Sequence, residues 1–146
     1  MMSTIYFNDT AQKYGEFSNF YLASFRNTSG IFFSSVIHFY YANALIKIYP
    51  DIARKIRTMQ SPIEVYAYAK EYISTISLDE DMKCALMRSG LFFKFTQNKN
   101  LKHILLETRG KEIVYDNQKD LFWGVNRDGR GENKLGILLS ELRGIL

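Results

Sequence analysis

A glycine-rich loop close to the end of the chain has the composition of an anion-binding element. Segment 124–131 carries three glycines and runs toward an expected helix that Asn133 would cap. A glycine loop that leads into a helix N-terminus suits a phosphate, because the first amides of a helix lack partners inside the helix. Arg127 and Arg130 lie in the same loop and could pair with phosphate through two parallel hydrogen bonds. The candidates for a phosphate-binding loop are Gly129, Arg130, Gly131 and Asn133, and the alternative is an exposed basic turn.

Strands and helices that would position such a loop can be read from local patterns. Short strands are expected over residues 3–7, 31–33 and 112–115, with an aromatic loop over 14–21. Helices are expected from 34 or 35 to about 49, from 61 to about 73, from 79 through 93, from 98 or 100 to about 110, and from 133 through 145. These elements predict a mostly helical α+β domain with a small β-sheet.

The expected helix ends carry recognisable signals. Ser61 can accept a hydrogen bond from the amide of Glu64, and Pro62 suits the first helical position. Asp79 can cap the following helix, and Pro50 is expected to end the first one. The apolar side of the helix after Asp79 is expected to run through Met82, Leu86, Ser89 and Phe93.

Length and composition limit the class of protein. The 146 residues fit one domain over residues 1–146, and the single cysteine can form neither an internal disulfide nor a zinc site. The N-terminus lacks the pattern of a secretory signal, and no apolar run is long enough to cross a bilayer, so we expect a cytoplasmic protein without a membrane partner. A net charge of +4 suits a phosphate-bearing ligand or weak attraction to nucleic acid. The 15% share of aromatic residues indicates a ring-filled core or a pocket that stacks on flat ligands.

Three blocks of sequence together resemble one known family. Residues 14–20 read Tyr-Gly-Glu-Phe-Ser-Asn-Phe, and residues 94–97 read Lys-Phe-Thr-Gln ahead of a leucine-containing helix. Residues 120–124 read Asp-Leu-Phe-Trp-Gly, followed by the glycine loop and by Asn-Lys-Leu-Gly at 133–136. In order and spacing these blocks are similar to the NADAR (YbiA-like) family, over about residues 4 to 146.

The resemblance implies an enzyme that cleaves the N-glycosidic bond between a ribose and a nitrogen. One branch of the family acts on riboflavin-pathway intermediates that carry a ribose phosphate, and another removes ADP-ribose from guanine bases in DNA. The family needs no metal or cofactor. Such cleavage passes through an oxocarbenium-like sugar, which a carboxylate can stabilise.

Individual residues take on expected roles from this resemblance. Asp120 matches a family aspartate and would stabilise the sugar cation or act as a base, unless it only caps its own turn. Lys94 would hold a phosphate or attack the sugar carbon, although helical lysines are usually solvated. His38 also matches a family residue but is expected to be structural. The expected ligand contacts are Ser18, Asn19, Phe20, Gln97 and Trp123, with turn chemistry as the alternative for Ser18 and Asn19 and a core position as the alternative for Trp123.

Several positions depart from the family pattern. Ile37 stands where the family has an active-site glutamate, and isoleucine can neither take a proton nor stabilise a cation. Tyr41, Ala44 and Tyr115 replace a family glutamine, lysine and glutamate. Glu16 is the nearest motif residue that could serve as a second acid beside Asp120.

Three functions therefore stay open at this point. The first is an N-glycosidase acting on a ribosyl-phosphate or ADP-ribosyl compound. The second is a family member that binds or sequesters an ADP-ribose or nucleotide-type ligand without cleaving it, which Ile37 favours. The third is direct binding to nucleic acid, for which the sequence contains no known motif, apart from ADP-ribosylated nucleic acid as a substrate.

Overall fold

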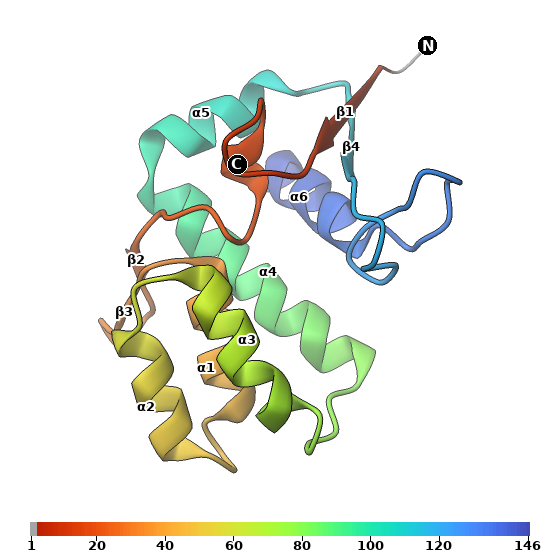
Figure 1. Cartoon of the computed structure of the whole chain (residues 1–146). Coiled ribbons are helices and arrows are strands. Elements are labelled where there is room, and N and C mark those ends of the chain that lie inside the picture. The colour runs from red at the N-terminus through yellow and green to blue at the C-terminus, as the bar shows by residue number, and fades with distance from the viewer. Residues whose placement is uncertain (1–2) are drawn as a thin grey trace. The chain divides into compact units, whose positions relative to one another are not determined.

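The computed structural model describes residues 3–146 and divides into two compact units. The first unit comprises the described residues up to Ser18 together with Lys99–Leu146, and the second unit is Asn19–Asn98. Within residues 3–146, each unit holds one two-stranded ladder, with two α-helices in the first unit and four in the second (Figure 1). The prediction of a mostly helical α+β fold is confirmed, and the expected small sheet is two separate ladders.

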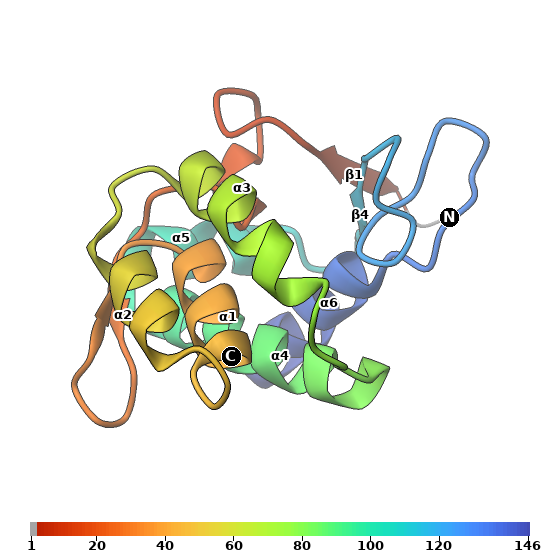
Figure 2. The same ribbon diagram turned by 60° about the horizontal axis from the view of Figure 1, so that its bottom comes forward.

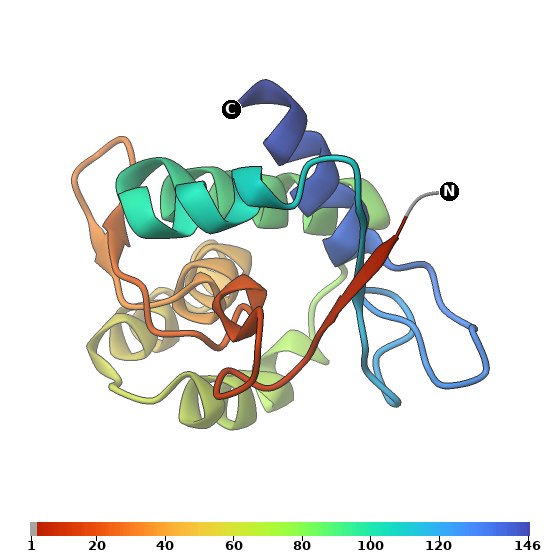
Figure 3. The ribbon, with the colours of Figure 1, turned by 90° about the horizontal axis from the view of Figure 1, so that it is seen from above.

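The first unit is built on a parallel pair of strands. Strand β1 (Thr4–Phe7) pairs with β4 (Glu112–Tyr115), and helix α6 (Lys134–Ile145) packs on β4 (Figure 3). Helix α5 (Lys99–Glu107) contacts α6, and the short 3-10 helix η1 (Gly15–Phe17) follows β1 in the chain. The core of this unit is aliphatic and aromatic, with buried Ile5, Phe7, Phe17, Leu101, Leu105, Ile113, Leu135, Leu139 and Leu142.

A small residue lets α6 lie directly on β4. A Cβ atom added at Gly136 would come within 2.1 Å of the carbonyl oxygen of Ile113, which no real side chain tolerates. Arg143, near the other end of α6, donates to the carbonyl oxygens of Thr108 and Lys111 at 2.7 and 2.9 Å. Both ends of α6 are therefore tied to the segment that contains β4.

The second unit surrounds one buried helix. Helix α1 (Val36–Leu45) contacts α2 (Pro50–Thr58), α3 (Pro62–Ile73) and α4 (Glu80–Gln97) (Figure 2). Seven of its residues are buried, so α1 is the core of this unit rather than an amphipathic surface helix. An antiparallel pair, β2 (Phe25–Arg26) with β3 (Phe32–Phe33), lies ahead of α1 in the chain.

Most expected helix starts are confirmed. The side chains of Ser35, Ser61 and Asp79 each accept the backbone amide three residues later, at 3.2, 3.3 and 2.8 Å. Each therefore satisfies one of the amides that a helix start leaves without an intrahelical partner.

Two details of the helix prediction are wrong. Pro50 does not end the first helix but begins α2, a helix that was not predicted. Proline suits a helix start because the N–H that it lacks has no intrahelical partner in the first turn. The buried side of α4 runs through Met87, Gly90, Leu91, Lys94 and Phe95, whereas Met82 is 49% exposed. Gly90 lies on the buried side because it allows α4 to approach α1 closely. A Cβ at this position would lie 3.0 Å from the Phe39 ring.

Candidate functional site

The residues that the sequence singled out divide between the two units. Lys94, Asn19, Phe20 and Gln97 belong to the second unit, together with Ile37 and His38. The first unit holds Ser18, Asp120, Trp123, Gly129, Arg130, Gly131 and Asn133.

Lys94 is a fully buried lysine, with no exposed surface. Its Nζ atom lies 5.8 Å from the centroid of the Tyr21 ring and 5.2 Å from that of Phe95. Aromatic faces stabilise an ammonium group electrostatically, and lysines are almost never fully buried without such partners. The expectation of a solvated helical lysine therefore does not apply at this position.

Asn19 carries a buried acceptor that no donor fills. The residue is 8% exposed, and within residues 3–146 its Oδ1 atom has no hydrogen-bond partner. Its backbone carbonyl accepts from the amide of Ile37 at 3.3 Å, which fixes this residue beside the start of α1. An unfilled buried acceptor costs about 1–3 kcal/mol, so this atom is suited to a donor from a bound ligand or a water molecule.

Aromatic side chains continue from the same loop. The ring of Phe20 meets that of Tyr66 edge to face at 5.9 Å between centroids, and Tyr66 meets Tyr41 at 6.0 Å. Tyr66 is 43% exposed. The row formed by Phe20, Tyr41 and Tyr66 presents rings of the kind on which a flat base can stack.

Gln97 has a structural role in the second unit. Its Oε1 accepts from the amide of Arg26 at 2.8 Å, and its Nε2 donates to the carbonyl oxygen of Arg26 at 2.7 Å. This two-bond bridge joins the end of α4 to β2. A contact between Gln97 and a ligand stays a prediction.

His38 is held in one protonation state by its neighbours. Its Nε2 lies 2.8 Å from the carbonyl oxygen of Met59, which can only accept, so Nε2 carries the proton. Its Nδ1 lies 2.7 Å from Ser35 Oγ and accepts from that hydroxyl. Burial lowers the pKa of His38 below its usual 6.5, against a smaller opposing effect of the Met59 hydrogen bond. The ring connects α1 to the segment between α2 and α3, as expected for a structural histidine.

Asp120 is built into a turn of the first unit. One carboxylate oxygen, Oδ1, accepts from the amide of Trp123 at 2.9 Å, and the amide of Asp120 donates to Asn117 Oδ1 at 2.9 Å. The residue is half-buried. One carboxylate oxygen of Asp120 therefore caps the turn, as the alternative interpretation predicted. The same bond fixes the orientation of the second oxygen. Trp123 is also half-buried, with its ring edge to face against Phe122 at 4.7 Å.

Several amides of the glycine loop are satisfied within the loop. The amides of Asp128 and Arg130 both donate to Asn126 Oδ1 at 3.0 Å, and that of Gly129 donates to the Asn126 carbonyl at 3.0 Å. Gly129 and Gly131 have φ angles of 78° and 131°, and a Cβ at Gly131 would lie 2.2 Å from the Gly124 carbonyl oxygen. These glycines are required by the backbone path of the loop.

The start of α6 is likewise closed by backbone groups. The amides of residues 132–135 donate to carbonyl oxygens of residues 121–124, at distances between 2.8 and 3.3 Å. The expected capping by the Asn133 side chain is wrong, because this residue adopts a φ of 51° and makes no such bond. Its Oδ1 accepts from the amide of Tyr115 at 3.0 Å, and its Nδ2 donates to the Ile113 carbonyl at 2.9 Å.

Free amides at the start of α6 therefore no longer support phosphate binding by this loop. Unpaired amides were expected at this helix start, and the amides at residues 128–130 and 132–135 have partners instead. The exposed side chains of Arg127 and Arg130 can still hold an anion. The ligand role of the loop stays a prediction.

Residues 3–146 contain neither a cluster of metal ligands nor a membrane-spanning helix. Within them, no three or more histidine, cysteine, aspartate or glutamate side chains are placed to hold a metal ion. No helix in this part of the chain is long and apolar enough to cross a membrane.

Sequence reasoning missed the residues around Lys94 and Phe20. Tyr21, which faces the Lys94 ammonium group, closes the aromatic segment 14–21, so its position was the available signal. Tyr66 carries no motif, and only packing brings it beside Phe20.

The chain is similar to known proteins of one family. The model of the NADAR domain matches residues 5–146 and so spans both units. The chain is 31% identical over 140 residues to the N-glycosidase YbiA of Shigella flexneri, covering 95% of this chain and 86% of that protein. It is 31% identical to a riboflavin biosynthesis protein of Vibrio vulnificus, covering 98% of this chain but only 38% of that longer protein. The NMR structure of Escherichia coli YbiA is 30% identical and superimposes with a TM-score of 0.85, over 99% of this chain and 86% of that one. The predicted family is confirmed, and the chain belongs to the NADAR family.

Proposed function

We propose that this protein is an N-glycosidase that hydrolyses the bond between C1′ of a ribose and a nitrogen. The names of the YbiA relatives bear out the predicted function class. The substrate class that we propose is a small ribosyl-phosphate or ADP-ribosyl compound, including a riboflavin-pathway intermediate or an ADP-ribosylated base in nucleic acid. A cytoplasmic location is part of the same proposal.

The reaction needs charge stabilisation and water. The bond from C1′ to the nitrogen breaks with its electrons going to the leaving nitrogen, which then takes up a proton. Water adds to C1′ and loses a proton, so the products are the free base and the hydroxylated sugar. A carboxylate beside the sugar lowers the energy of the cationic transition state, and this is the role that we assign to Asp120.

The observation that carries the proposal is the unfilled acceptor at Asn19. A ribose hydroxyl or a base N–H can donate to Asn19 Oδ1, which has no donor within residues 3–146. Lys94, buried and facing Tyr21 in the same unit, supplies a positive charge for a phosphate as its ammonium form, or a nucleophile for the sugar as its neutral amine. The aromatic row of Phe20, Tyr41 and Tyr66 supports stacking of the base.

A ligand-binding protein without turnover is the second candidate. Ile37, which stands where the family has a glutamate, is 5% exposed and lies at the start of α1. Its side chain leaves this position without an acid or base. Such a protein would hold its ligand intact, and its stability would rise with ligand concentration.

Mass spectrometry with a substrate panel separates the two candidates. The panel contains ADP-ribose conjugates, NAD, riboflavin-pathway ribosylamines and DNA with ADP-ribosylated guanine. Release of a free base is the expected result and names the substrate class. A panel member recovered bound and uncleaved would favour the second candidate, and absence of both binding and release would remove the support for either.

Two substitutions of Asp120 separate charge from structure. Asp120→Asn keeps an oxygen that can accept from the Trp123 amide but removes the negative charge, whereas Asp120→Ala removes both. We expect turnover by Asp120→Asn to fall about 10²- to 10³-fold, as when other preorganised electrostatic groups are removed. Its unfolding free energy should stay near that of the wild type, while Asp120→Ala loses about 1 kcal/mol as well.

Wild-type turnover in Asp120→Asn would refute the catalytic role of Asp120 and leave only its place in the turn. Lys94→Met provides the companion variant in the second unit, because it keeps the length of the side chain and removes its charge. We expect it to lose turnover, and unchanged turnover would exclude Lys94 from the reaction.

A further inference from the structure

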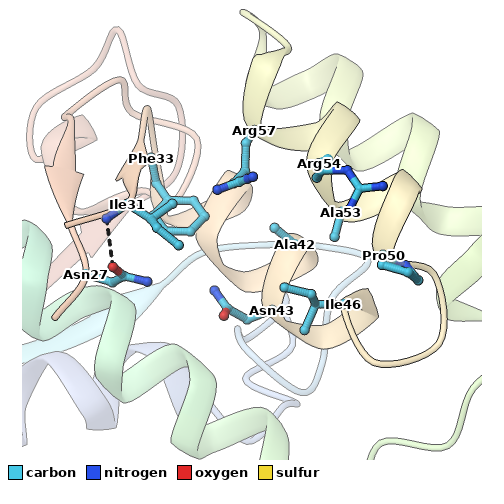
Figure 4. A pocket seen from close by; sticks show the side chains of 10 residues that line it. All are labelled: Asn27, Ile31, Phe33, Ala42, Asn43, Ile46, Pro50, Ala53, Arg54 and Arg57. Carbon is cyan, nitrogen blue, oxygen red and sulfur yellow. Dashed lines mark hydrogen bonds between the residues drawn. The ribbon is translucent and has the colours of Figure 1, made fainter. Parts of the chain in front are cut away.

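A pocket lies in the second unit, apart from the residues discussed above. Helices α1 and α2 and the turn between β2 and β3 enclose a pocket of about 230 Å³ (Figure 4). Asn27 and Phe33 line it from the turn and β3, Asn43 and Ile46 from α1 and the residue after it, and Arg54 and Arg57 from α2. None of the residues expected to bind substrate is among those that line it.

The pocket faces the opposite side of α1 from Ile37. Successive residues of an α-helix are turned by about 100°, so Ile37, Tyr41 and Ala44 share one side of α1. Ala42 and Ile46, which line the pocket, lie about 140–180° away from Ile37. Any ligand of this pocket is therefore separate from a ligand that contacts the Ile37 side.

One positive charge in the pocket is uncompensated. Arg57 is half-buried, and within residues 3–146 its side chain makes no hydrogen bond or ion pair. Figure 4 shows its guanidinium group directed toward the Phe33 ring. Arg54, one turn earlier, is paired with Asp51, so a single guanidinium group remains for an anion.

The other walls are apolar or fixed. Phe33, Ala42 and Ala53 are buried, and they supply apolar surface. Asn27 Oδ1 accepts from the amide of Ile31 at 2.9 Å, a bond drawn in Figure 4, and so it shapes the rim rather than serving a ligand. Asn43 donates one of its two amide hydrogens to the Phe39 carbonyl at 2.8 Å and retains the other.

We propose that this pocket binds a small carboxylate with a compact apolar body. The carboxylate pairs with the planar Arg57 guanidinium through two parallel hydrogen bonds, and the apolar body lies against Phe33 and Ala42. One uncompensated charge matches a monoanion better than a phosphate dianion. Since a water molecule occupies about 30 Å³, the pocket has room for a molecule the size of roughly eight waters.

Titration with sodium benzoate, followed by ¹⁵N NMR at constant ionic strength, tests the proposal without any enzymatic assay. We expect shifts of the backbone amides of Ala42, Asn43 and Arg57, and a Kd of about 1 mM for so small a ligand. Benzamide, which has the same shape without the charge, should bind at least about tenfold more weakly, because hydrogen bonds to a charged partner are the stronger ones.

Three variants complete the test. Arg57→Gln should weaken benzoate binding about tenfold, whereas Arg88→Gln, the same change at an exposed position of α4, should leave it unchanged. Ile46→Trp places a large ring at a residue that is 51% exposed at the pocket rim, and it should block binding without filling the core.

The proposal is overturned by equal binding of benzamide and benzoate, by tighter binding of inorganic phosphate, or by benzoate shifts elsewhere in the protein. Full affinity in Arg57→Gln would overturn it too. If Arg57→Gln does not fold, the benzamide comparison in the wild type and the Ile46→Trp variant decide the question. The result is independent of the glycosidase assay, so the two proposals can fail separately.

Discussion

The buried ring of His38 makes the stability of the second unit depend on pH. In the folded protein its Nε2 donates to Met59 and its Nδ1 accepts from Ser35, so the neutral form is the one that fits. Burial lowers the pKa of His38 from 6.5, while the unfolded chain binds the proton at its ordinary pKa. Below pH 6.5 the unfolded state therefore holds more protons than the folded state, and the free energy of unfolding falls as the solution is acidified.

The size of the effect follows from proton linkage. A histidine that stays neutral in the folded state but titrates near 6.5 when unfolded loses at most about 1.4 kcal/mol of stability between pH 7.5 and 5.5. With a urea dependence of about 2 kcal/mol per molar, that loss lowers the unfolding midpoint by about 0.7 M. Urea unfolding at pH 7.5, 6.5 and 5.5, followed by far-ultraviolet circular dichroism, measures it.

The chain offers a matched control for this measurement. His103 is the only other histidine, and its exposed ring pairs with Glu107 one turn along α5. His38→Gln should lower stability at every pH but remove most of the decline between pH 7.5 and 5.5. His103→Gln should retain that decline. A wild type and a His38→Gln variant with the same pH dependence would refute the assignment of the effect to this ring.

The first unit yields two further predictions, both measured by urea unfolding. Gly136→Ala should cost about 3 kcal/mol or more, because its Cβ would press on the Ile113 carbonyl, whereas Gly144→Ala in the same helix meets nothing within 4 Å and should stabilise the protein by about 0.5 kcal/mol. Equal effects of the two changes would contradict the close contact of α6 with β4. Asn133→Asp keeps an acceptor for the Tyr115 amide but loses the donor to Ile113, and it should cost about 2 kcal/mol. Wild-type stability in that variant would show that the two bonds to β4 contribute little.

Local sequence signals were sufficient for much of the secondary structure. Ser35, Ser61 and Asp79 cap their helices as expected, since capping depends on atoms only three residues apart. The strand Glu112–Tyr115 also has its predicted bounds. Pro50 shows the limit of such signals, because the same residue type can precede a helix or follow one.

The candidate site residues were identified by type, but their surroundings were not. The motif around Lys94 could be read directly, yet its complete burial beneath Tyr21 depends on rings more than seventy positions apart in the chain. Asn133 was expected to cap its own helix, and it bonds to Ile113 and Tyr115, about twenty positions earlier.

The sequence by itself determined the family, the function class and most helix starts, because motifs and caps are contained in short stretches of chain. Only the tertiary structure decided which polar groups have partners. Among residues 3–146, it showed that the amides of residues 128–130 have partners, that Asn19 Oδ1 has no donor, and that the side chain of Arg57 has no partner at its pocket. The physical reason is that a hydrogen bond or a buried charge depends on distances of a few ångströms between groups far apart in sequence, and residue type alone does not specify those distances.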